Sequence, residues 1–153
     1  MISNNPAVKT WIKRCLLLGA LGLAFGRVEA VERKLHIEAP ATISPGQPLA
    51  VTIFASTDAG QGEQVGFLQA EVSVDDGKTW TAICYLQKSG PKVVHKANLK
   101  PGAAGTAVQL RVRAAFRDGP AGDVDFSGTA IVWDKTWDAW KSPPTKHARI
   151  AVK

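Results

Sequence analysis

Short runs of hydrophobic residues that alternate with polar ones fill most of this chain, and turn-forming Gly, Pro, Asp and Asn separate the runs. Successive side chains of a β-strand point to opposite faces, so a period of two predicts a strand with one buried face. The clearest run is Ala107–Phe116, in which apolar positions alternate with Gln109, Arg111 and Arg113. One face of this strand is expected to be buried and the other solvated.

The same pattern predicts seven further strands: Leu35–Glu38, Leu49–Ala55, Phe67–Val74, Thr79–Leu86, Val93–Leu99, Phe126–Trp133 and Ala148–Val152. Within the second of these runs, Val51, Ile53 and Ala55 are expected to face inward. Two polar, glycine-containing stretches, Ser56–Gly66 and Arg117–Asp125, are predicted to be exposed loops. Seven or eight short strands in one domain favour an immunoglobulin-like antiparallel β-sandwich over a closed barrel.

The first thirty residues have the composition of a secretory signal peptide. Basic residues come first, an apolar run Cys15–Gly26 follows, and Val28–Ala30 supplies small residues for cleavage. The apolar run is too short to span a bilayer. We therefore expect a signal peptide over residues 1–30, one sandwich domain over residues 31–153, no membrane span in the mature chain, and a periplasmic or secreted location.

The charge of the mature chain gives little support for nucleic-acid binding. The signal segment contains four of the bases and one of the acids, so its removal lowers the net charge from +6 to +3. Nucleic-acid-binding proteins gather basic residues on one face. Here the bases are spread along the chain, and Arg111, Arg113 and Arg117 are expected to lie on the solvated face of a strand.

Cysteine and histidine residues are few. If Cys15 leaves with the signal, only Cys84 stays, so no internal disulfide can form, and a buried small hydrophobic side chain is the expected role of Cys84. The three histidines, His36, His95 and His147, have no metal-ligand spacing. No metal site and no cofactor are expected, and a small metal or redox carrier built on these four residues remains a third hypothesis.

One turn motif stands out. Ser73, Asp75, Gly77 and Trp80 have the spacing of the Asp-box, a hairpin turn. An Asp side chain can accept backbone N–H groups across such a turn, and Gly can adopt a positive φ without a Cβ clash. The motif predicts local structure and no catalysis. It occurs once, which with the chain length excludes a sialidase-type propeller.

The segment Glu71–Trp80 around this turn resembles the hairpin in the immunoglobulin-like C-terminal domain of sulfite oxidase-type molybdenum enzymes. That domain serves there in dimerisation, so the resemblance implies a packing or assembly module. The molybdenum-binding domain of the family has no room in this chain, and its catalytic residues are not carried over.

Three tryptophans, Trp133, Trp137 and Trp140, follow one another at spacings of four and three residues, which brings them to one side of a helical turn. They can form an exposed aromatic platform for a sugar or a protein partner. Alternatively, they close one end of the sandwich as part of its core, because a small domain without disulfides needs buried aromatic area.

The sequence contains no nucleophile motif, phosphate-binding loop or evident carboxylate pair, so it is not expected to be an enzyme. The leading hypothesis is an exported, non-catalytic interaction domain, an accessory or assembly subunit of a periplasmic protein such as an oxidoreductase. A carbohydrate-binding module that uses the three tryptophans is the second hypothesis.

Overall fold

Eight strands in two packed sheets form the structure, a computed structural model that describes residues 30–133, 137 and 140–153. The predicted signal peptide therefore lies outside the described residues, apart from Ala30. The strands are β1 (Arg33–Glu38), β2 (Thr42–Ile43), β3 (Leu49–Thr57), β4 (Gln64–Ser73), β5 (Thr81–Gln87), β6 (Lys92–Leu99), β7 (Ala107–Arg117) and β8 (Lys146–Val152).

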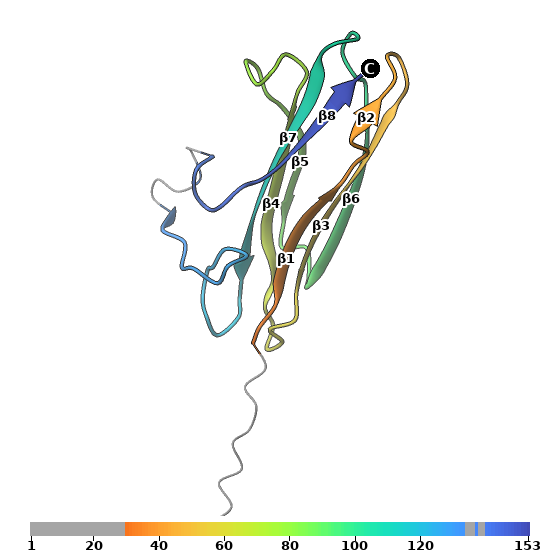
Figure 1. Cartoon of the computed structure of the whole chain (residues 1–153). Helices are drawn as coiled ribbons and strands as arrows, with labels where there is room; N and C mark the ends of the chain where they lie inside the picture. The colour runs from red at the N-terminus through yellow and green to blue at the C-terminus, as the bar shows by residue number, and fades with distance from the viewer. Residues whose placement is uncertain (1–29, 134–136, 138–139) are drawn as a thin grey trace, which may run out of the picture.

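The two sheets lie face to face (Figure 1). One has the strand order β1-β3-β6 and the other the order β2-β8-β7-β4-β5. All pairs are antiparallel except β2 with β8. The expected all-β sandwich is thus confirmed. Among the described residues, no helix is long and apolar enough to cross a bilayer.

The core between the sheets is built from the alternate residues that the sequence pattern singled out. Val51, Ile53 and Ala55 of β3 are buried, as predicted, and face the buried apolar positions of β4 and β7. Cys84 of β5 belongs to the same cluster and forms no disulfide. Burial raises the pKa of its thiol, so Cys84 is a packing residue, as expected.

The predicted strand Phe126–Trp133 is wrong. Around it the chain makes only two isolated bridges, in which Val124 pairs with Phe116 and with Ala130. The carboxylate of buried Asp125 accepts the backbone N–H groups of Ser127 (2.7 Å) and Thr129 (3.1 Å). These N–H groups would otherwise pair with a neighbouring strand. Because they bond to the Asp125 side chain, the segment forms a turn and no strand ladder. The short strand β2 was not predicted, since two residues carry no period.

Candidate functional site

The arginines of β7 lie on the outer face of the five-stranded sheet, opposite polar residues of β4. The register pairs Arg111 with Glu71 and Arg113 with Gln69. Arg111 donates to Glu71 Oε2 from Nε at 2.9 Å and from Nη2 at 2.5 Å. Arg113 donates to Gln69 Oε1 from Nε at 3.1 Å and from Nη2 at 2.9 Å. These cross-strand bonds fix both guanidinium planes above the sheet.

Tryptophan rings stack on these fixed guanidinium groups. The Arg111 guanidinium lies 4.1 Å from the ring centroids of both Trp80 and Trp140. That of Arg113 lies 4.3 Å from Trp140 and 4.4 Å from Trp137. Each distance is well within the range of a cation–π interaction. Trp140 thus contacts two arginines, and the turn tryptophan Trp80 joins the same array.

A third arginine extends the array along β7. The Arg117 guanidinium lies 5.3 Å from the Phe67 ring and 5.4 Å from the Trp133 ring. Asp123 accepts from Arg117 Nε at 2.9 Å and also from Trp133 Nε1. A Cβ at Gly66 would lie 2.3 Å from the Arg117 side chain, so a larger residue there would force that arginine to shift where it crosses β4. We call the complete set the arginine–tryptophan stack: Arg111, Arg113, Arg117, Phe67, Trp80, Trp133, Trp137 and Trp140.

The expectation that the three arginines lie on a solvated face is wrong. Arg113 is only 2% exposed, and Arg111 and Arg117 are half-buried. The alternation in β7 was correct, but side chains from distant parts of the chain cover its polar face. The alternating polar residues Gln69 and Glu71 of β4 could have indicated this burial, because they can pair with arginines on a neighbouring strand.

The three tryptophans Trp133, Trp137 and Trp140 are all half-buried. They are therefore neither the exposed platform nor the core residues that the sequence left as alternatives. The structure brings the rings together on the outer face of a sheet, and not at the end of the core. Trp133 and Trp137 lie 5.3 Å apart between ring centroids. The predicted helical turn between them involves residues 134–136 and 138–139, which lie outside the described residues.

Beside the stack, an aromatic patch reaches the surface. Tyr85 of the edge strand β5 is 53% exposed, and its ring centroid lies 6.4 Å from that of Phe67. Phe67 in turn lies 5.0 Å from Trp133, whose chain neighbour Val132 is exposed. We define the aromatic patch as Tyr85, Phe67, Trp133 and Val132. Two of its rings, Phe67 and Trp133, also belong to the stack, and the Arg117 guanidinium contacts both of them.

The Asp-box residues form a tightly bonded turn between β4 and β5. Asp75 accepts the backbone N–H of Thr79 at 2.9 Å and the hydroxyl of Ser73 at 2.8 Å. Gly77 has a φ of 84° and donates its N–H to Ser73 Oγ at 2.8 Å. The Trp80 Nε1 donates to the Gly77 carbonyl at 3.1 Å. This turn sets Trp80 over Arg111, so it supports the stack.

Acid should weaken the turn. Hydrogen bonds from the Thr79 hydroxyl and N–H and from the Ser73 hydroxyl lower the pKa of Asp75 from 3.8 to about 2. Because the folded pKa is depressed, the stabilisation by this carboxylate is complete above pH 3.8 and is lost as the pH falls toward 2. We expect Asp75→Asn to be less stable than the wild type at pH 7 and to differ from it much less at pH 2, where the carboxylate of the folded protein is about half protonated. Urea unfolding followed by tryptophan fluorescence at both values measures this; an unchanged difference at pH 2 would contradict it.

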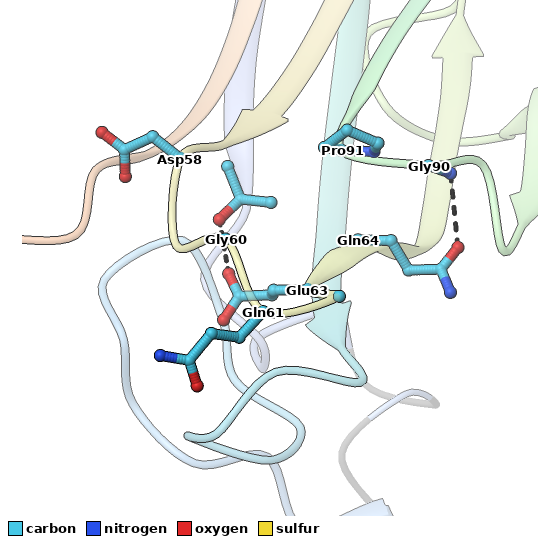
Figure 2. Close-up of a pocket in the computed structure, with 9 residues that line it drawn as sticks. Asp58, Gly60, Gln61, Glu63, Gln64, Gly90 and Pro91 are labelled. Atoms are coloured by element: carbon cyan, nitrogen blue, oxygen red, sulfur yellow. Dashed lines mark hydrogen bonds between the residues drawn. The ribbon is translucent and has the colours of Figure 1, made fainter.

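A hollow of about 530 Å³ lies at the end of the sandwich, between the loop after β3 and the turn before β6 (Figure 2). Its polar groups bond to the protein. Glu63 accepts two bonds from Arg33, at 2.7 and 2.6 Å, and one from Thr57 at 2.5 Å. Gln64 bonds to Asp118 at 2.6 Å and accepts the Gly90 N–H at 3.3 Å. These hydrogen bonds join the loops to one another and leave few polar groups free to bind a ligand.

Glu63 corrects the prediction that Ser56–Gly66 is an exposed loop. The residue is 4% exposed, although it stands in a polar, glycine-containing stretch. Burial by itself raises the pKa of Glu63, but the hydrogen bonds from Arg33 and Thr57 and the charge of Arg33 outweigh burial and hold the pKa below its ordinary value. The carboxylate is therefore ionised and structural.

The structure does not bring the three histidines to one point. His36 and His95 lie on β1 and β6 of the same sheet, but His36 shares a face with Phe54, whereas His95 pairs with inward-facing Ile53. His147 lies on β8 and lines a small hollow with His36. Across the described ranges, no group of three or more His, Cys, Asp or Glu side chains could hold a metal ion.

Comparisons with known proteins find likeness only in the fold. No family model matches the chain, and no curated protein matches it in sequence. The superoxide reductase (neelaredoxin) of Ignicoccus hospitalis is similar in structure, with 12% identity and a TM-score of 0.47 over 80% of this chain and 83% of that chain. The sporulation control protein Spo0M of Bacillus subtilis gives 14% identity and a TM-score of 0.35 over 82% of this chain and 50% of that chain.

The expectation that this chain is not an enzyme is contradicted by such similar structures, because superoxide reductases are enzymes. The expectation rested on the lack of motifs in the sequence. A sandwich can assemble a site from residues that are distant in the chain, so a missing motif does not exclude catalysis. With TM-scores of 0.47 or less, no activity, metal or residue role passes from these proteins to this chain.

Proposed function

We propose that this chain is an exported interaction domain, an accessory or assembly subunit of a periplasmic protein, and that the aromatic patch is its contact surface. The observation that supports this most is the exposed Tyr85 beside a fixed array of tryptophans and arginines. Tyr, Trp and Arg are the residue types most enriched where binding energy concentrates in protein interfaces. Rings that are already held in place lose little conformational entropy on binding.

The stack makes a protein partner a better candidate than a sugar. A carbohydrate stacks on an open indole face, but guanidinium groups lie over the rings of Trp137 and Trp140. The most exposed groups of this surface are instead a phenol and an aliphatic side chain, with half-buried aromatic rings beside them. Such a mixture suits a protein surface that contributes both apolar contacts and hydrogen bonds.

Two features of the sequence support the location and the kind of partner. The signal-like segment of residues 1–30 favours export. The resemblance of Glu71–Trp80 to a hairpin of a dimerisation domain in sulfite oxidase-type enzymes favours assembly with an oxidoreductase. The Trp80 of that hairpin lies in the stack that holds the patch.

The proposal is tested by isolating the chain from its native periplasm with whatever protein it binds in fixed stoichiometry. We expect Tyr85→Ala to weaken that complex by about tenfold or more, because a hot-spot residue contributes more than about 1.4 kcal/mol. Binding of the purified partner is measured by calorimetry. Tyr85 is exposed, so this variant should keep the wild-type stability.

Lys100→Ala is the matched control, because Lys100 is exposed and follows β6 of the opposite sheet. It should bind as tightly as the wild type. A chain that purifies without a partner would contradict the proposal, as would equal losses in the Tyr85 and Lys100 variants. Binding of oligosaccharides with a change in tryptophan fluorescence would favour the carbohydrate hypothesis instead.

A further inference from the structure

The outer face of the three-stranded sheet has a distinct order of side chains. The strand registers place three residues side by side in each of three rows that face away from the core: Lys34, Ser56 and Lys92; His36, Phe54 and Val94; Glu38, Thr52 and Lys96. The first row is basic, the second mainly apolar, and the third carries one charge of each sign. Neighbouring rows are about 7 Å apart, the rise of two residues in a strand.

The first two rows border a hollow. Its volume is about 410 Å³, and its lining includes Lys34, His36, Phe54, Lys92 and Val94. Val94 is 49% exposed and Phe54 is half-buried, so apolar surface is accessible on its floor. Small-molecule sites commonly have volumes of about 300–1,000 Å³ and combine an apolar lining with a few polar groups. This hollow has both properties.

Positive charge dominates the edge of the hollow. Lys34 and Lys92 stand on the two edge strands, roughly 10 Å apart at the backbone, with the Ser56 hydroxyl between them. Long lysine side chains can reach a common anion across that distance. Lys34 is paired with Glu32 at 2.9 Å in an exposed ion pair, a kind that contributes little stability and that a ligand can displace. In the described part of the chain, Lys92 has no carboxylate within ion-pair distance, and its Nζ lies 5.5 Å from the Phe54 ring centroid.

We propose that this hollow binds a small anion that carries an apolar body, such as an aryl phosphate or aryl carboxylate. The anionic group lies between Lys34 and Lys92, within reach of the Ser56 hydroxyl, and the ring rests on Phe54 and Val94. Charge complementarity selects the anion, since the lining holds two lysines and one acid, Glu38. The site is on the opposite sheet from the aromatic patch and does not depend on the proposed function.

Phenyl phosphate is the first compound to titrate against the full chain, with amide NMR shifts as the readout. We expect saturable shifts that centre on Phe54 and Val94 and that weaken as salt is added. Inorganic phosphate lacks the ring and benzyl alcohol lacks the charge, so each should bind at least about tenfold more weakly than phenyl phosphate. Phenyl phosphate binding no more tightly than inorganic phosphate, or no more tightly than benzyl alcohol, would overturn the proposal.

Lys92→Gln tests the charged half of the site, and Phe54→Ser the apolar half. Lys92→Gln should weaken phenyl phosphate binding by about tenfold, whereas Lys100→Gln, an exposed lysine outside the hollow, should leave it unchanged. Phe54→Ser should reduce the affinity for phenyl phosphate to that for inorganic phosphate. Unchanged binding in the Lys92 variant, or shifts that centre elsewhere on the chain, would refute this site.

Discussion

Replacing Glu63 with alanine should lower the free energy of unfolding by about 3–5 kcal/mol, the cost of removing one partner from a buried ion pair. Glu63 is 4% exposed and the Arg33 side chain is 9% exposed. The two groups form a bidentate pair, with bonds of 2.7 and 2.6 Å. Without the carboxylate, the guanidinium keeps its desolvation cost and loses its counter-charge.

Chemical denaturation at pH 7 measures this effect, and Glu32→Ala is the control. Glu32 also pairs with a basic residue, Lys34, but that pair is exposed and its loss should cost less than about 1 kcal/mol. Most domains have a total stability of about 5–15 kcal/mol, so the Glu63 variant should be close to unfolded at elevated temperature. A Glu63 variant as stable as the Glu32 variant would show that water reaches Arg33 and that the end of the sandwich is open.

Replacing Arg113 with alanine should cost about 3 kcal/mol, because it removes two cation–π contacts and leaves polar partners unpaired. The Arg113 guanidinium lies over Trp137 and Trp140 and donates to the Gln69 side chain and the Trp137 carbonyl. We also expect the tryptophan emission to shift to longer wavelength, since Trp137 loses the guanidinium that lies over it and Trp140 keeps only the contact with Arg111. Arg113→Lys should recover little of the loss, because an ammonium group cannot stack or form the planar fork.

Arg149→Ala is the matched control for the stack. Arg149 stands on the neighbouring strand β8 and pairs with Asp76 at 3.3 Å, but both side chains are exposed. Its replacement should change stability by less than about 1 kcal/mol and leave the emission unchanged. If Arg113→Ala behaves in the same way, Arg113 contributes little to stability and other contacts hold Trp137 and Trp140.

The positions of Arg113 and Glu63 show how much of the site could be predicted from the sequence. The alternation in β7 correctly identified which residues face the core. It could not show that Trp137 and Trp140, more than twenty residues later in the chain, cover the other face. Glu63 was assigned to an exposed loop because its neighbours are polar, although Arg33 from β1 buries it.

The Asp125 turn shows where prediction of strands from the sequence pattern fails. The apolar residues after it suggested a strand, but the Asp125 carboxylate binds the backbone N–H groups that a strand would have used. A period of two describes side chains only, and it does not show where the backbone hydrogen bonds go. The Asp-box turn was easier to predict, because its partners lie within a few residues of Asp75.

The sequence by itself determined seven of the eight described strands, the buried faces of β3 and β7, and the Asp-box turn, because alternation and turn chemistry act over a few residues. Only the tertiary structure decided which polar side chains are buried, which arginines the tryptophans cover, and which rows of residues border a common hollow. Those properties depend on strand register and on contacts between distant segments. The charge or polarity of a side chain does not show which distant residues will cover it in the folded protein.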